Sequence, residues 1–412
     1  MNRLETKNKE LNWKRNVTLY LFGQGVSLIG TGLVSFAIMW YVTLDTNSGV
    51  VLTLYTAAIS LPAVFITPFA GVWADRFSRK ALINIADGSI AVVTLGIAFL
   101  FSQGMASIGA LLACSVIRSL GQGTQMPAES AVIPQIVPEH ALMRVNGINS
   151  SIQSFSMLAS PLMAAGLLSV APIQVILYID VVTAAVGIGI LVFFVKVPRL
   201  EGVASSQGKQ AGGYRREILA GLSYIRAHGY VKHIFLFAAA FFVFLTPAAM
   251  LTPLQVIRDF GDEYWKLMAI EVVFSAGMLL GGILISVWGG FKSKSLTAAV
   301  GAAFVGLTGV GLGITGHFFV YLSVMAVMGI AVPLINAPIQ TILQARVDEA
   351  YMGRVFSVMT IISGTVMPLS MIAFGPLADL IAIDYLLIAA GVGTVFLGAG
   401  FLLDKVVRQA GQ

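Results

Sequence analysis

Asp87 and Arg118 are ionisable residues inside apolar stretches of this 412-residue sequence, and each stretch is long enough to cross a membrane. An ionisable group inside a bilayer costs roughly 2.5–3.5 kcal/mol on insertion scales, so it needs a compensating interaction or a function. Each lies roughly 10–12 Å from the same face of the membrane, counted at 1.5 Å per residue. The sequence therefore predicts that they pair, directly or through one polar neighbour, either for proton transfer or as a purely structural ion pair.

Asp180 and Glu271 are two further carboxyl groups in apolar stretches, and they belong to opposite halves of the chain. Each lies about seven residues from the outer end of its stretch, by the same helical count. An apolar surrounding disfavours the charged form of a carboxyl group, so such a side chain can take up a proton outside and release it inside. We expect both to carry protons or attract a cationic substrate. Hydrogen bonding between helices is the alternative.

The decapeptide GVWADRFSRK, residues 71–80, places one acid and three bases between two apolar stretches. Gly71 lets neighbouring helices approach closely because it has no side chain. Asp75, at a helix end, can pair with basic residues or accept from free backbone N–H groups of another helix. Its basic neighbours either join such an ion network or only fix the orientation of the chain; they are Arg76, Arg79 and Lys80.

Composition identifies the elements that must position these residues. The chain is 57% hydrophobic with a mean hydropathy of +0.88, well above the apolar content of soluble domains. Gaps between charged residues predict an all-α polytopic membrane protein with twelve spans. The predicted spans are 17–42, 50–74, 81–102, 106–126, 147–170, 173–195, 233–256, 266–289, 296–316, 318–340, 355–379 and 384–404.

The distribution of Lys and Arg predicts the orientation of these spans. With twelve spans, both termini and the loop of residues 71–80 share one side. That side holds every basic residue of the 25 in the chain except Arg118, Arg258 and Lys266, so it is expected to be cytoplasmic. The same bias accounts for the net charge of +6 without nucleic-acid binding. One cysteine, Cys114, excludes an internal disulfide.

The longest polar stretch, residues 196–232, divides the spans six and six. We expect an N-terminal bundle at 1–195, a cytoplasmic linker at 196–232 and a C-terminal bundle at 233–412. The linker ends in a short amphipathic segment that is predicted to lie on the inner leaflet or to contact the protein itself. VPEHALMRV and VDEAYMGRV, each after the fourth span of its half, form an internal repeat, and such repeats mark secondary transporters.

The loop, the spans, the linker and the repeat together resemble the major facilitator superfamily. More narrowly, the chain resembles the bacterial macrolide-efflux transporters, which are proton-driven drug exporters, through the segments IRSLGQG, PAESAVIPQIVPEHAL, LYID, GGILISVWGGF, YMGRVFS and FGPLAD. The resemblance implies two pseudo-symmetric six-helix bundles and rocker-switch exchange of a drug for protons. It further implies a bacterial inner-membrane location, no cofactor, no metal, and a transporter rather than an enzyme. We expect a monomer.

The resemblance also implies roles for individual residues. Asp75 would latch the outward-facing state, with Arg144 and Arg354 joining the ion network from equivalent ends of the two repeats. Asp379, at the inner end of the eleventh span, is expected to help close the cytoplasmic side. Arg118-x-x-Gly121 resembles a fourth-span motif linked to proton transfer. SPLMAAG resembles a degraded antiporter motif in which Pro161 kinks the fifth span, with Pro368 as its mirror in the eleventh.

The substrate is predicted to be an amphiphile, because Phe and Met side chains in the spans adapt to varied shapes. Gln24 in the first span and Gln153 in the fifth are candidate cavity residues. The chain has no G-x-x-x-x-G-K-[ST] motif of an ATP-driven pump, no H-E-x-x-H and no G-x-S-x-G. Two alternatives stay open: export of a siderophore or other endogenous metabolite on the same fold, and a membrane enzyme or lipid scramblase.

Overall fold

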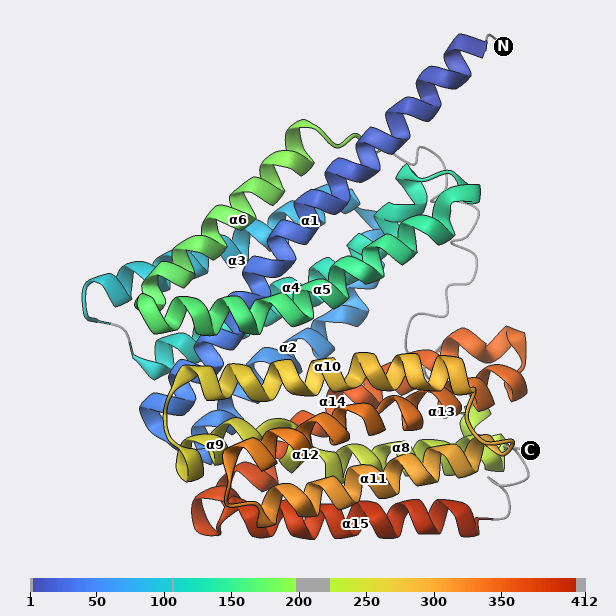
Figure 1. The fold of residues 1–412 in the computed structure, drawn as a ribbon. Coiled ribbons are helices and arrows are strands. Elements are labelled where there is room, and N and C mark those ends of the chain that lie inside the picture. Colours follow the sequence, from blue (N-terminus) through green and yellow to red (C-terminus); the bar gives the residue numbers. More distant parts are fainter. Residues whose placement is uncertain (1–2, 106, 198–222, 405–412) are drawn as a thin grey trace. The chain divides into compact units, whose positions relative to one another are not determined.

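The protein is helical throughout the residues that the computed structural model describes, 3–105, 107–197 and 223–404 (Figure 1). The helices are α1 (Arg3–Thr46), α2 (Gly49–Arg76), α3 (Arg79–Ser102), α4 (Ile108–Ile136), α5 (Leu142–Val170), α6 (Ile173–Phe193), α8 (Gly229–Thr246), α9 (Thr252–Phe260), α10 (Tyr264–Trp288), α11 (Lys294–Ile314), α12 (Phe318–Ala331), α13 (Pro333–Arg346), α14 (Glu349–Leu380) and α15 (Ile383–Leu403). Residues 198–222, most of the predicted linker and its surface segment, lie outside the described residues.

Eleven stretches of the described chain are long and apolar enough to cross a membrane. Two of them combine consecutive helices: a π-helical turn, Pro247–Leu251, joins α8 to α9, and α12 runs into α13 at Pro333. The remaining helix, α4, has 29 residues and more polar side chains. The prediction of an all-α polytopic membrane protein is confirmed, although several helices continue beyond the predicted spans.

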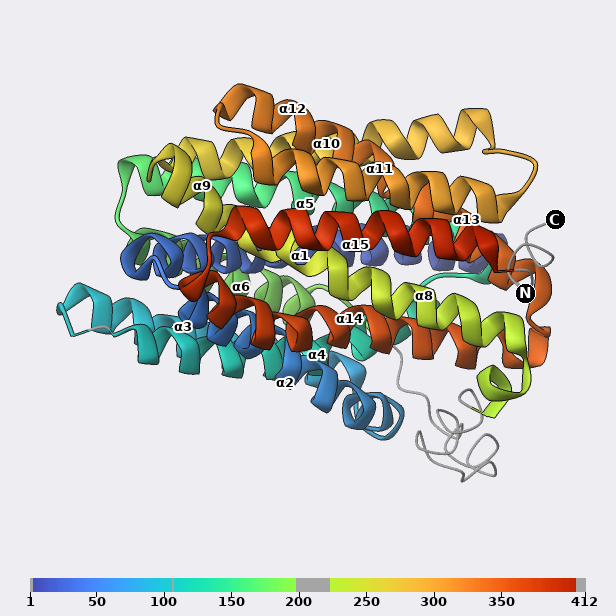
Figure 2. The same cartoon turned by 90° about the horizontal axis from the view of Figure 1, so that it is seen from below.

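The helices form two compact units. The first comprises Met1–Tyr41 and Ala58–Ala211, and the second comprises Val42–Ala57 and Gly212–Gln412. The end of α1, the following turn and the start of α2 therefore belong, by their contacts, with the C-terminal helices. Within the second unit, α15 lies beside both α11 and α8 (Figure 2).

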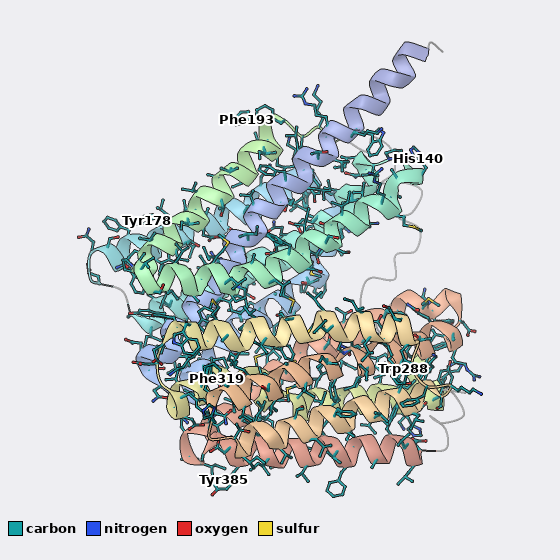
Figure 3. The ribbon with its side chains drawn as sticks, viewed as in Figure 1. His140, Tyr178, Phe193, Trp288, Phe319 and Tyr385 are labelled. Atoms are coloured by element: carbon teal, nitrogen blue, oxygen red, sulfur yellow. The ribbon has the colours of Figure 1, made fainter. Side chains whose placement is uncertain are left out.

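The surfaces of the helices carry many exposed apolar side chains. Phe193 on α6, Phe319 on α12 and Tyr385 on α15 point away from the ribbon (Figure 3). Tyr385 is 67% exposed although its ring is largely apolar. Such exposure is unfavourable in water, whereas a bilayer solvates these groups. The exposed apolar surface thus agrees with the membrane class that the composition predicts.

In the first unit, the hydroxyl group of Ser119 on α4 contacts the backbone of α2 next to Pro62. Pro62 lacks a backbone N–H and so leaves one helical hydrogen bond unmade. One residue further, Ser119 Oγ accepts from Ala63 N–H at 3.0 Å and donates to the Ile59 carbonyl at 2.8 Å. The serine therefore bridges two backbone groups that a regular helix joins directly. An insertion of this kind is a common cause of bends in helices.

In the second unit, glycines allow α11 and α15 to approach closely. A Cβ atom on Gly306 would lie 2.6 Å from the Gly391 carbonyl oxygen, and one on Gly391 would lie 2.6 Å from the Gly306 oxygen. Small residues at helix interfaces permit such backbone contact. This close packing stabilises helix association in a membrane, where the hydrophobic effect does not favour helix–helix over helix–lipid contact. The two glycines are therefore expected to be necessary for this packing.

Replacing Gly306 with Val should destabilise the protein by about 1–3 kcal/mol, because the new side chain overpacks the α11–α15 contact. The measurement is the fraction of detergent-purified protein that stays monodisperse after heating. Gly282→Val is the matched control, since a Cβ at that position meets nothing within 4 Å. Equal heat sensitivity of the two variants would contradict the packing argument.

Candidate functional site

The centre of the first unit contains a buried ion pair between Arg118 on α4 and Asp180 on α6. Arg118 Nη1 donates to Asp180 Oδ2 and, at 2.6 Å, to Thr94 Oγ1 on α3. Nη2 donates to the Thr31 carbonyl oxygen on α1 at 3.4 Å. The two charged residues are only 3% and 1% exposed. This arrangement compensates both charges and joins four helices.

The prediction that Asp87 pairs with Arg118 is wrong. Ser27 Oγ on α1 donates to Asp87 Oδ1 at 3.4 Å. Depth in the membrane is similar for Asp87 and Arg118, but the guanidinium group is directed to α6 rather than to Asp87. Asp180 is the partner instead, although it was predicted, like Glu271, to carry protons or attract a cationic substrate.

A cavity of about 450 Å³ lies on the same unit, lined by one face each of α1, α4 and α5. Both glutamines expected at a cavity, Gln24 on α1 and Gln153 on α5, line it. Other polar lining residues recur at helical spacing, such as Asn149, Gln153, Ser156 and Ser160 on α5. Apolar groups complete the wall; they are Leu28, Phe36, Met126, Ile152 and Met157.

Glu129 lines this cavity, and sequence analysis did not single it out. The predicted fourth span ended at residue 126, which placed Glu129 in a loop. The helix in fact continues to Ile136, so Glu129 lies on the same face of α4 as Gln122 and Gln125. Gln125 Nε2 donates to Glu129 Oε1 at 2.6 Å. The signal that could have found it is this polar spacing of three and four residues.

The second unit holds Glu271 and a smaller cavity. Glu271, on α10, is half-buried and has no hydrogen-bond or ion-pair partner within the described part of the chain. A cavity of about 290 Å³ is lined by α8, α13 and α14, with Asn336, Gln340 and Thr360 among its polar groups. Glu271 does not line that cavity.

Asp379 does not lie where sequence analysis placed it. Its carboxylate accepts from Ser48 Oγ at 2.8 Å and from the N–H groups of Gly49 and Val50 at 2.7 and 3.0 Å. Arg258 Nη2 donates to the same carboxylate at 2.8 Å. Asp379 thus caps the first turn of α2, whereas residues 71–76 form the end of this helix. The prediction that Asp379 and the loop of residues 71–80 share one side is therefore wrong, because they lie at opposite ends of α2.

The loop of residues 71–80 is bound to its own unit by two bases. Arg79 donates to the carbonyl oxygens of Ala74 and Ala131 at 3.1 and 2.7 Å. Lys80 Nζ donates to the carbonyl oxygens of Val192 and Val195 at 3.0 and 2.8 Å. These bonds connect the start of α3 to the ends of α4 and α6.

The other residues predicted to form a latch occupy varied surroundings. Gly71 has open space around it, Arg76 and Arg144 are exposed, and Arg354 lies over the Tyr351 ring at 5.3 Å. The side chain of Asp75 lies outside the described residues. Pro161 and Pro368 lie inside α5 and α14, which continue through them. The latch and kink roles stay predictions.

The family model of the Major Facilitator Superfamily matches residues 20–371. The chain belongs to this superfamily. It is 30% identical to macrolide efflux protein A of Streptococcus pyogenes over 382 residues, 92% of this chain and 93% of that protein. It is 24% identical to the multidrug efflux pump Tap of Mycobacterium bovis over 398 residues, 92% of this chain and 88% of that protein. The predicted family is confirmed, and the chain is a transporter rather than an enzyme.

Solved structures of other superfamily transporters share the fold. The nucleoside transporter NupG matches with a TM-score of 0.70 and 14% identity, covering 95% of this chain and 98% of that one. A D-xylose–proton symporter matches with a TM-score of 0.69 and 14% identity, covering 95% of this chain and 99% of that one. Identities this low support the fold and nothing finer.

Replacing Arg118 with Ala should cost about 3–5 kcal/mol, because it leaves the buried Asp180 charge without compensation. Replacing both residues, as Arg118→Met with Asp180→Leu, should recover most of that loss, since neither charge is then buried. Survival of purified protein after heating is the measurement for both variants. A single Arg118→Ala variant as heat-resistant as the wild type would contradict the pairing.

Proposed function

We propose that this superfamily transporter exports amphiphilic drugs, macrolides among them, in exchange for protons across the bacterial inner membrane. The observation that carries the proposal is the similarity to macrolide efflux protein A along more than nine-tenths of both chains. The cavity of the first unit supports it, because its wall combines amides and hydroxyls with Met and Phe side chains, which suit a large amphiphile.

Proton coupling is proposed to use carboxyl groups that have no cationic partner. Among the described residues, Asp87 has Ser27 as its hydrogen-bond partner and no cationic partner, and Glu271 has neither. Without a compensating cation, protonation is the remaining way to remove such a charge from a low dielectric. Asp180 is the poorer candidate, since its carboxylate is already paired with the Arg118 guanidinium.

The transporter is proposed to act as a monomer by rocker-switch alternating access, with both termini in the cytoplasm. Protonation would change the relative stability of two conformations and so shift their populations. In this scheme the contact of Asp379 with the first turn of α2 closes the outer side, and it must break when that side opens.

Inverted membrane vesicles should accumulate erythromycin only when a pH difference, acidic inside, is imposed. Replacing Glu271 with Gln should abolish this uphill uptake but leave exchange of labelled for unlabelled drug, because exchange needs no net proton movement. Asp262→Asn, at an exposed acid just beyond the end of α9, is the control and should behave as the wild type. Uptake that persists after an ionophore collapses the pH difference would contradict the proposal.

Replacing Asp379 with Asn should favour opening of the outer side. Hydrogen bonds to a charged group contribute about 1.5–3 kcal/mol, so the opening equilibrium should rise about tenfold or more. A cysteine in place of the buried Thr53, in a Cys114→Ser background, should therefore react faster with a membrane-impermeant maleimide in intact cells. Asp262→Asn is again the control substitution. An unchanged reaction rate would show that Asp379 does not hold the outer side closed.

A further inference from the structure

The cavity of the first unit has a single ionisable side chain. Of its eighteen lining residues, only Glu129 carries a titratable group; the others are amides, hydroxyls, glycines and apolar side chains. Among the described residues, no Lys, Arg or His contributes to the wall. The charge of this cavity is therefore set by one carboxylate on α4.

The partners of Glu129 do not neutralise it. Its carboxylate accepts from Gln125 Nε2, and that amide group also approaches Gln24 Oε1 at 3.4 Å. The Tyr20 hydroxyl on α1 donates to the backbone oxygen of Glu129 at 3.4 Å and leaves the carboxylate unaffected. The Gln125 amide thus orients the carboxylate toward a fixed position without supplying a positive charge.

The charged groups nearby do not neutralise Glu129 either. Asp87 on α3, whose carboxylate accepts from Ser27, is a second acid of this unit. Arg118, on the same helix as Glu129, is committed to Asp180. A carboxylate in such surroundings attracts a cation strongly, because a low dielectric increases the interaction of opposite charges.

Of these two acids, Glu129 is the one that can present its charge to a bound molecule. Asp87 is 3% exposed and does not line the cavity, whereas Glu129 does. The two acids can therefore divide the work, with Asp87 behind the wall for the proton and Glu129 at the surface for cargo. The amide and hydroxyl groups around Glu129 can meanwhile hydrogen-bond to polar substituents of the same molecule.

We propose that Glu129 binds the protonated amine of the cargo, so that the cavity selects amphiphiles with one cationic nitrogen and several hydroxyl groups. This rests on the proposed export function and adds to it the charge of the substrate and the residue that recognises it. The apolar body of the molecule would pack against Phe36, Met126 and Met157. Neutral analogues of equal size would lose the binding free energy of this one ionic contact and so bind more weakly.

The test measures binding by calorimetry to purified full-length protein at neutral pH. Erythromycin, whose single tertiary amine is protonated, is compared with its N-demethyl-N-acetyl derivative, which is neutral. The wild type should bind the cation at least about tenfold more tightly. Glu129→Gln should remove this preference and leave binding of the neutral derivative unchanged. Glu129→Asp, which keeps the charge, should retain part of the preference.

Glu263→Gln is the matched control. Glu263 lies in the loop before α10, where its hydrogen bond with Lys266 at 2.5 Å lowers its pKa, so the substitution removes one full negative charge away from the cavity. The control should keep the preference for the cation. If Glu129→Gln weakens binding of both ligands equally, or of neither, Glu129 does not recognise charge and the proposal is overturned.

A second ligand pair separates this proposal from the export function. Ethidium is a permanent cation, and Nile red is a neutral dye of similar apolar character. Wild-type protein that binds neither macrolide would contradict macrolide export, while the loss of ethidium binding alone in Glu129→Gln would still support the role of Glu129. A wild type that prefers the neutral member of each pair would overturn the role of Glu129 directly.

Discussion

A charge inside a membrane must be compensated, and the pairing of Arg118 with Asp180 is the compensation on which the first unit depends. Arg118 is buried among four helices, and an unpaired guanidinium group there would cost several kcal/mol. Because Asp180 satisfies it, Arg118 cannot also neutralise the other buried acids. Asp87 and Glu129 consequently remain carboxyl groups without a cationic partner among the described residues, and their chemistry is open to protons and to cationic molecules.

The helices near this pair combine close packing with local irregularity. Ser119, one residue after Arg118, inserts into α2 where Pro62 has already interrupted the backbone hydrogen bonds. The first part of α2, capped by Asp379, belongs with the second unit, whereas the rest of the helix belongs with the first. Pro62 and the Ser119 contact lie just after this change, and both features commonly accompany a bend in a helix.

Much of the fold follows from the sequence, because gaps between charged residues locate membrane helices and polar residues in those gaps mark an interior face. Gln24 and Gln153 were found in this way, and both line the cavity. Side-chain partners are not fixed by hydropathy. Asp87 and Arg118 are predicted at a similar depth, but depth does not fix the direction in which a side chain leaves its helix. Glu129 was missed because hydropathy ends a span where polar residues accumulate, although α4 continues to Ile136. Asp379 caps the first turn of α2 through a contact between residues 330 positions apart, which hydropathy does not encode.

The central claim is that a cationic cargo at Glu129 disfavours protonation of Asp87, which lies behind the wall of the same cavity, so that cargo and proton exclude one another. The most direct measurement is the proton release that accompanies erythromycin binding to purified protein in weakly buffered detergent solution. The account predicts that binding releases protons, and that the release disappears when the neutral derivative is bound. Erythromycin binding without any change in bound protons across the neutral pH range would contradict it.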